Sequence, residues 1–456
     1  MRANIARWTV ARGRAAALLL GLVATTACTT ATPTRYKTLT EGWRRSEAAA
    51  RATDVGDRLF EGAPFLERQE LIRQVLERNP TLRAARYAWR AALERYPQVT
   101  ALDDPLLGAG VAPRSIGSSR ANDAPKFDLS QKLPFPGKLR LRGEAVLAEA
   151  EAASHDFASV RLRLATLASL LFDDHYLAAR SLEINAEHIA LLEEFQRIAT
   201  VRYEAGKASQ QDPIQAEVEL THALHREILL QTAQRVTAEQ INTLLHRPPS
   251  RTLPPAPPRA PVPRSAADPA DQLIEQALEE RPELAAAAAR VAAEEARVDL
   301  AWRDYFPDFT LTGSYNRLWQ EEDLQPFVGI QLNVPLQLGR RRAALEEARA
   351  RLEQARSQRR AIEDEVRFGV QSGADRLAEA HHVMRLFADR LLPAARDQVA
   401  AARSGFETGR NSFLVLIDAE RNLRNVELGY EEALANLTRR RAELDQTLGR
   451  IPGLTW

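Results

Sequence analysis

The 456-residue sequence has few of the residues that form disulfides, soft-metal sites and aromatic cores. It contains one cysteine and two methionines, Met1 and Met384. A single cysteine excludes an internal disulfide framework, and two methionines exclude a ladder of thioether ligands. Aromatic residues make up only 6% of the chain, whereas Ala, Leu, Glu and Arg are abundant. This composition is typical of long helices packed side by side.

The sequence also lacks an excess of charge and a recognisable catalytic constellation. Its 62 basic and 61 acidic residues give a net charge of +1, which argues against a general nucleic-acid binder. His222 and His225 have a spacing that metal ligands can use, but a solvent or interface role is the more common one. Asp173-Asp174-His175 has neither a nucleophile nor a phosphate loop beside it. We therefore predict no enzyme, no cofactor and no bound metal.

The sequence contains no long hydrophobic run, and the apolar stretch near its start is short. Residues 15–27 form an apolar stretch of about 13 residues after several arginines, whereas a membrane-spanning helix needs about 20. This pattern predicts a signal peptide over 1–27. Cys28 follows Thr25-Thr26-Ala27, which resembles a bacterial lipobox without its usual Leu. We predict lipid attachment at Cys28 and a tether over 28–64. The alternative is simple cleavage beside an incidental cysteine.

The chain contains an internal duplication. Three segments recur in the same order at offsets between 201 and 203 residues: 71–85 as 273–287, 126–138 as 327–340, and 203–217 as 406–420. This predicts two halves, 65–246 and 270–450, with a short tail over 451–456. Nine prolines between 246 and 269 predict an extended linker over 247–269.

Each half is predicted to contain two antiparallel helical rods, one continuous and one broken. No proline occurs between Gly137 and Asp212, and apolar residues there recur at helical spacing. A helix over about 139–205 would be roughly 100 Å long. The expected helices are 65–95, 139–205 and 207–246, then 270–304, 339–407 and 411–449. Pro393 lies inside the last long helix, where the first half has Ala190, and predicts a kink there.

Alternating apolar and polar residues predict strands at 126–133, 309–316 and 327–334, with a weaker candidate at 99–112. Such strands have one apolar and one polar face, as a soluble hairpin also has. Four strands are too few to close a barrel in lipid, so several copies must share one. Three copies would supply twelve strands.

These features together resemble the TolC-type outer-membrane efflux protein family over residues 65–450. The resemblance rests on the duplicated helix–hairpin–helix unit, the strand exit 133–138 (LPFPGK), and the tip motifs 203–209 (YEAGKAS) and 406–412 (FETGRNS). It implies a mainly α fold with a membrane β-barrel: a homotrimer with a twelve-helix periplasmic tunnel and a shared twelve-stranded barrel in the outer membrane. It also implies docking to a periplasmic adaptor and an inner-membrane pump, of the RND type for the lipoprotein branch that serves drug or heavy-metal export.

The two tip motifs supply the residues predicted for docking. Gly206 and Gly409 allow the positive φ of a tight reversal after a helix, and Ser209 and Ser412 can cap the helix that follows. By resemblance, these turns form the periplasmic mouth. The predicted tip and adaptor-docking residues are Gly206, Lys207, Ser209, Gly409, Arg410 and Ser412.

The predicted gate lies just beyond the tips. Asp212 and Asp418 follow their glycines by six and nine residues, where the family places carboxylates around the constriction. In a trimer each would form a ring of charge that selects cations or holds the gate through Arg421 or the basic tip residues. The second half has Val415 where the first has Asp212. The alternative is that these are ordinary solvated charges at helix ends.

Three other classes of protein remain open. The chain could be a duct for protein or polysaccharide secretion, a periplasmic adaptor lipoprotein, or a non-conducting coiled-coil envelope lipoprotein. The duplicated tips and the four alternating strands favour an efflux duct over the last two.

Overall fold

The computed structural model describes residues 33–52, 59–60, 62–117, 125–258, 269–319 and 321–453. The predicted signal peptide and Cys28 lie outside these residues. The chain divides into two compact units. Unit 1 comprises Met1–Arg45, Tyr87–Ser154 and Ala285–Arg360, and unit 2 comprises Ser46–Arg86, His155–Leu284 and Ala361–Trp456. Unit 1 contains the sheet, and unit 2 contains both tip turns.

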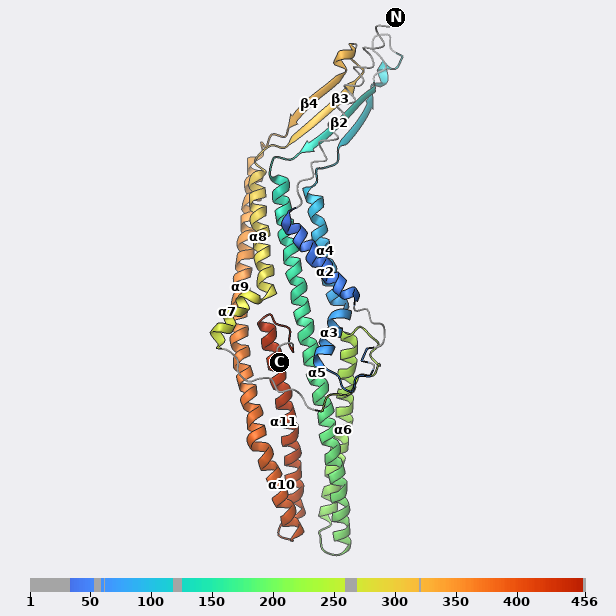
Figure 1. Cartoon of the computed structure of the whole chain (residues 1–456), viewed down its shortest axis with the longest axis vertical. Helices are drawn as coiled ribbons and strands as arrows, with labels where there is room; N and C mark the ends of the chain where they lie inside the picture. The colour runs from blue at the N-terminus through green and yellow to red at the C-terminus, as the bar shows by residue number, and fades with distance from the viewer. Residues whose placement is uncertain are drawn as a thin grey trace. The chain divides into compact units, whose positions relative to one another are not determined.

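The strands of unit 1 form one antiparallel sheet in the order β1-β2-β3-β4 (Figure 1). They are β1 (Leu106–Val111), β2 (Pro125–Leu133), β3 (Phe309–Asn316) and β4 (Pro326–Leu332). The three stronger strand predictions are confirmed to within two residues. The weaker one, 99–112, is confirmed only for its second half, because helix α4 continues to Thr100.

The strand register places most of the apolar side chains of the four strands on one face, with Leu106 and Phe327 on the other. Leu129 lies opposite Leu107 on β1 and Gly313 on β3, and Gly313 lies opposite Val328 on β4. Residues directly opposite one another point to the same side of a sheet. The apolar face therefore includes Leu107, Ala109, Phe127, Leu129, Phe309, Leu311, Val328, Ile330 and Leu332. Leu107 is 77% exposed and Ile330 is 69% exposed, so the outer strands leave this face largely uncovered within the described chain.

Gln131 interrupts the apolar face, and its hydrogen bonds explain why it is tolerated. Its side-chain amide donates to the carbonyl oxygens of Asp103, at 2.7 Å, and of Lys132, at 3.1 Å. The residue is only 6% exposed. A buried amide with its hydrogen bonds made has little energetic penalty, so one polar residue does not disrupt the pattern.

An ion cluster joins the two halves where the strands meet the helices of unit 1. Lys138 Nζ lies 2.9 Å from Asp308 Oδ1 and 3.2 Å from Asp304 Oδ1, and its side chain is 4% exposed. The rings of Phe135 and Phe306 stack with centroids 4.8 Å apart. The LPFPGK segment of the first half thus packs against the residues that lead into β3.

The helices follow the predicted order. They are α2 (Thr34–Ala52), α3 (Arg68–Arg78), α4 (Pro80–Thr100), α5 (Lys138–Glu204), α6 (Gln211–Leu244), α7 (Ala270–Glu280), α8 (Pro282–Arg303), α9 (Leu338–Leu386), α10 (Leu392–Glu407) and α11 (Phe413–Thr447), with short 3-10 turns at Pro113–Ser115 and Glu322–Leu324. Helix α2 lies in the range predicted as a tether. In unit 1 its Tyr36 ring stacks on Tyr96 of α4 at 4.9 Å.

The prediction of single helices over 65–95 and 270–304 is wrong, because each range contains two helices. Asn79 and Arg281 are extended, both with ψ 123°, and a proline follows each. Proline disfavours the helical conformation of the residue before it. Asn79 Oδ1 also accepts the N–H of Thr81 at 2.9 Å, which starts α4. The Asn79-Pro80 and Arg281-Pro282 pairs are the sequence feature from which this break could have been predicted in both halves.

The second long rod is distorted where Pro393 predicts it. A π-helical turn, Phe387–Leu391, separates α9 from α10. Pro393 has no N–H to donate to the carbonyl four residues before it, which accounts for the local change of hydrogen bonding. Helix α5, with Ala190 at the matching place, runs for 67 residues without a break. Gly429 of α11 faces the turn, where a Cβ would lie 2.6 Å from the Phe387 ring.

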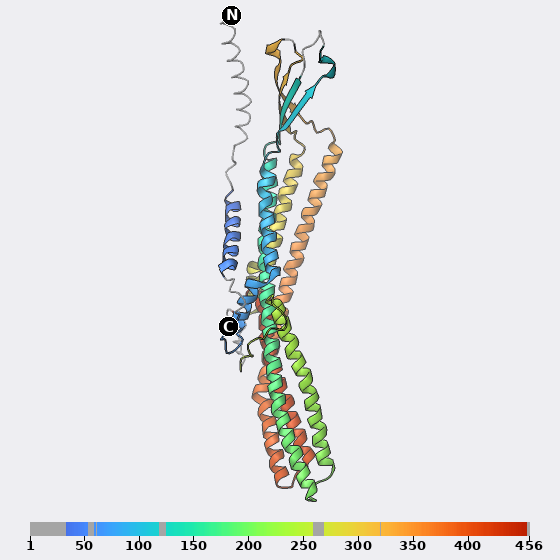
Figure 2. The same ribbon diagram turned by 90° about the vertical axis from the view of Figure 1, so that its right-hand side faces the viewer.

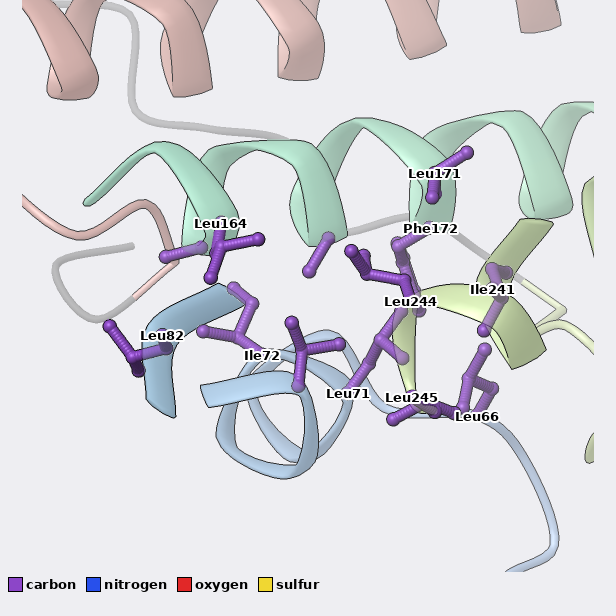
Figure 3. Close-up of a cluster of buried hydrophobic side chains, with 13 residues drawn as sticks. Leu66, Leu71, Ile72, Leu82, Leu164, Leu171, Phe172, Ile241, Leu244 and Leu245 are labelled. Atoms are coloured by element: carbon purple, nitrogen blue, oxygen red, sulfur yellow. The ribbon is translucent and has the colours of Figure 1, made fainter. Parts of the chain in front are cut away.

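Two corresponding apolar clusters hold unit 2 together. In the first half, Leu71 and Ile72 of α3 pack on Leu164 and Phe172 of α5 and on residues of α6 (Figure 3). In the second half, α7, α9 and α11 form the equivalent cluster, which includes Leu273, Val366, Val370, Leu437 and Leu444. Each short helix thus covers the junction of a long and a returning helix. Among the described residues, no helix combines the length and apolarity needed to cross a membrane.

Candidate functional site

The two tip turns have the same hydrogen-bonding pattern. At the first tip Gly206 N–H donates to Tyr203 O at 2.9 Å, and Lys207 N–H donates to Arg202 O at 2.8 Å. At the second tip Gly409 N–H donates to Phe406 O at 3.1 Å, and Arg410 N–H donates to Gly405 O at 2.8 Å. This pair of bonds is the Schellman ending of a helix. The sequence repeat therefore corresponds to a repeat of backbone geometry.

Both glycines have the positive φ that the turn requires. Gly206 has φ +70° and Gly409 has φ +72°, and a Cβ at either position would meet nothing within 4 Å. The requirement is conformational and not steric contact, because an L-residue loses about 1–2 kcal/mol in this region.

Replacing Gly409 with Ala is expected to destabilise the second tip by about 1–2 kcal/mol through backbone strain alone. Gly409→Asn is the matched control, since Asn tolerates this conformation and should lose much less. Hydrogen exchange of the amides of Thr408 to Asn411 measures the effect. Equal protection in both variants would show that strain does not control this turn.

The two serines behave differently. Ser209 Oγ accepts the N–H of Gln211, the first residue of α6, at 3.2 Å. Ser412 occupies the N-cap position of α11 with extended backbone, but its side chain makes no capping hydrogen bond. The N-cap position of α6 is Gln210, so Ser209 lies one residue before the cap and its bond closes the turn that leads into the helix. The prediction that the Ser412 side chain caps α11 is wrong. The helix begins instead with the backbone hydrogen bond from Val415 N–H to Ser412 O, at 3.2 Å.

In unit 2, α5–α6 and α10–α11 form two hairpins (Figure 2). An aromatic cluster packs between these helices close to the tip turns. The Phe413 ring lies 6.2 Å from Phe195 and 5.6 Å from Phe406, measured between centroids. The Arg202 guanidinium lies over the Phe406 ring at 4.4 Å. Buried residues from all four helices join this cluster, so the two hairpins pack on each other near their turns.

The predicted gate residues are only partly brought together. Arg421 Nη1 lies 3.4 Å from Asp418 Oδ1 on the same helix, and Arg421 Nη2 lies 2.5 Å from Glu219 Oε1 on α6. Glu219 is the partner that connects the two hairpins. Asp212, by contrast, makes no ion pair with any described residue, and it is half-buried in the first turn of α6.

The basic tip residues are exposed and lie outside these pairs. Arg410 Nε donates to Thr408 Oγ1 of its own turn at 3.0 Å. Lys207 and Arg410 are both exposed to solvent within the described chain. Neither forms an ion pair with Asp212 or Asp418 among the residues that the structure describes, so Arg421 alone fulfils the predicted pairing.

Comparison with known proteins identifies the family. The family model for outer membrane efflux proteins matches residues 71–246 and 273–450. The chain belongs to the outer membrane efflux protein family. The cobalt-zinc-cadmium resistance protein CzcC of Cupriavidus metallidurans is 25% identical over 252 residues, which covers 55% of this chain and 59% of CzcC. The chain therefore matches less than two thirds of the length of that relative.

Two solved structures of similar fold extend the match to most of the chain. The outer-membrane channel OprN superimposes with a TM-score of 0.71 and 22% identity, covering 88% of this chain and 95% of OprN. The outer membrane protein VceC of Vibrio cholerae superimposes with a TM-score of 0.72 and 17% identity, covering 84% and 96% of the two chains. The efflux-protein fold is thus present in both halves.

Sequence reasoning missed the buried polar residues of this efflux protein's unit 2. Asp173, which the sequence does not mark as catalytic, is fully buried and pairs with Arg68 and Thr438. Glu219 was missed because exposed and inter-helix carboxylates look alike in a helical sequence. Glu219 lies three residues after Ala216 and four residues before Ala223, and both alanines are fully buried. This helical spacing was the sequence feature that could have placed Glu219 on the packed side of its helix. Among the described residues, no group of three or more His, Cys, Asp or Glu side chains is placed to hold a metal ion.

Proposed function

We propose that this chain is the outer-membrane channel component of a tripartite efflux system, conducting small molecules or metal ions passively from periplasm to exterior. The observation that carries the proposal is the combination of a four-stranded sheet with two duplicated helical hairpins. The sheet has an exposed apolar face and unpaired edges at β1 and β4 within the described chain. Family membership supports the same function.

The unpaired edges support a homotrimer. Exposed strand edges are not tolerated in lipid, so β1 of one copy must pair with β4 of another. Three copies would close twelve strands around a lumen lined by Thr310, Thr312, Asp128 and Lys132, with the apolar face toward lipid. The repeats over 65–246 and 270–450 would supply four helices per copy to a periplasmic tunnel of twelve, and the linker over 247–269 connects them.

The tips support docking to a periplasmic adaptor and, through it, to an inner-membrane pump of the RND type. Lys207 and Arg410 are exposed on the two turns, and Gly206, Gly409, Ser209 and Ser412 define those turns. Asp212, Asp418 and Arg421 then form the gate and selectivity residues. CzcC is named for cobalt, zinc and cadmium resistance, which supports metal ions as one class of cargo.

Single-channel conductance in a planar lipid bilayer tests the function. The purified full-length protein should insert as a trimer and give discrete conductance steps. A folded trimer without conductance, together with unchanged metal and drug sensitivity in a deletion strain, would contradict the proposal and favour a structural envelope protein.

The lipid anchor at Cys28 is proposed as a secondary attachment. Cys28→Ala is expected to abolish incorporation of labelled palmitate while the single-channel conductance stays unchanged, because the shared barrel holds the trimer in the membrane. Cells grown with labelled palmitate, followed by bilayer recordings on the purified variant, measure both. A variant that keeps the label would disprove lipidation at this residue, and one that loses conductance would make the anchor essential for insertion.

A further inference from the structure

A buried cationic cluster lies between α5, α6 and α11 of unit 2, on the side of the aromatic cluster away from the tips. His188 of α5 is 6% exposed and Arg424 of α11 is 7% exposed. Arg421, one turn before Arg424, and Arg226 of α6 add further positive charge around His188. Burial and the repulsion of these three arginines lower the pKa of His188 to about 4, so its ring is neutral at pH 7.

The cluster has more positive than negative charge. Arg226, Arg421 and Arg424 contribute three positive charges, and Arg421 pairs with Glu219 and with the exposed Asp418. Arg424 makes no ion pair with the described residues. Its Nη2 donates to the neutral amide oxygen of Asn425, at 2.9 Å. Glu219 also attracts Arg424, but it already pairs with Arg421. A buried charge that is only partly compensated is unfavourable, so a further counter-charge is expected beside Arg424.

Three hydrogen-bonding nitrogens of the cluster are buried without a partner in the described chain. They are Nε of Arg421, Nε of Arg424 and Nε2 of His188. Each arginine Nε carries a hydrogen, and a neutral histidine can carry one on Nε2. Nearby, the Asn185 side chain donates to Ala223 O at 3.0 Å. This bond holds α5 to α6 beside the cluster.

We propose that this cluster binds one small inorganic anion of the halide class between α5, α6 and α11. The anion would accept hydrogen bonds from the three unpartnered nitrogens and neutralise Arg424. A carboxylate from a second copy fits less well, because both His188 and Arg424 are already more than nine-tenths buried inside one chain. A cation is excluded by the sign of the surrounding charge. This site does not depend on whether the protein conducts.

Diffraction from crystals of the full-length protein soaked in bromide tests the site directly. An anomalous peak within hydrogen-bond distance of Arg421 and Arg424 is expected. In detergent solution, the wild-type unfolding midpoint should rise by roughly 2–4 °C when chloride replaces gluconate at constant ionic strength. Arg424→Gln should lose this rise, whereas the matched control Arg367→Gln, an exposed arginine of α9, should keep it.

The pH dependence provides a second measurement that does not need a variant. A bound anion favours the protonated form of His188, so chloride stabilisation should grow as the pH falls from 7 toward 5. The absence of an anomalous peak would overturn the proposal. A peak without any chloride-dependent shift in solution would mean an adventitious ion only and would overturn it as well. A carboxylate of a neighbouring copy found against Arg424 would overturn it too.

Discussion

Replacing Arg68 with Ala is expected to lower the free energy of unfolding by about 3–5 kcal/mol, because it leaves a buried carboxylate without its partner. Arg68 Nη2 lies 2.6 Å from Asp173 Oδ1, and the two side chains are 6% and 1% exposed. The guanidinium also donates to Ser169 Oγ at 2.7 Å and lies 4.5 Å from the Phe172 ring centre. These contacts join α3 to α5, while Thr438 joins α11 to the same carboxylate.

The loss should depend on pH in a defined direction. Burial raises the pKa of Asp173, and the charge of Arg68 opposes this rise. Without Arg68 the pKa rises further. A carboxyl whose native pKa is above its unfolded value destabilises the native state as the pH rises through that range. The difference between Arg68→Ala and wild type should therefore be largest near pH 7 and shrink in acid.

Urea titration of the purified protein in detergent, followed by circular dichroism, measures this effect. Arg73→Ala is the matched control, because Arg73 pairs with Glu70 on the exposed side of the same helix and should lose less than about 1 kcal/mol. The double variant Arg68→Met with Asp173→Leu should recover most of the loss, since apolar replacements of a buried pair are often neutral. If the double variant were as unstable as the single one, packing and not charge would explain the result.

The features that sequence predicts well in this chain are those that occur twice or have a strict period. The tip glycines were predictable because both motifs recur in register, and a glycine after a long helix has one common use. The strand faces were predictable because alternation over eight residues fixes which side chains share a side. Pro393 was informative because its missing N–H acts locally and needs no knowledge of neighbouring helices.

The features that sequence did not predict depend on contacts between distant helices. Arg68 and Asp173 are more than 100 residues apart, and nothing in either local sequence distinguishes them from solvated charges. The same holds for Glu219 and Arg421, which lie in different halves. His188 and Arg424 occupy positions of the helical period that apolar residues usually take. Their burial becomes visible only when the partner helices are placed.

Replacing Arg421 with Ala is expected to raise the open probability of the channel by about 5–30-fold, on the proposed function. Arg421 lies on α11 and bonds Glu219 on α6, so this ion pair joins the two hairpins of unit 2. In the proposed gate the tips open by separation or shift of the hairpins, which would break this bond. Glu219 is 12% exposed and Arg421 38% exposed, so partial solvent screening limits the contribution to about 1–2 kcal/mol. A change of about 1–2 kcal/mol corresponds to a roughly 5–30-fold change in a two-state ratio.

Single-channel recording of the variants separates this role from general damage to the tips. Arg410→Ala is the control, because Arg410 is exposed and its side-chain bond stays within its own turn. Asp418→Ala should have a smaller effect than Arg421→Ala, because the Asp418 pair lies within α11 and does not join the hairpins. Exchanging the charges, with Arg421→Glu and Glu219→Arg together, should restore most of the closed population. An open probability that rises equally in Arg410→Ala and Arg421→Ala would assign the effect to tip charge and not to this inter-hairpin bond.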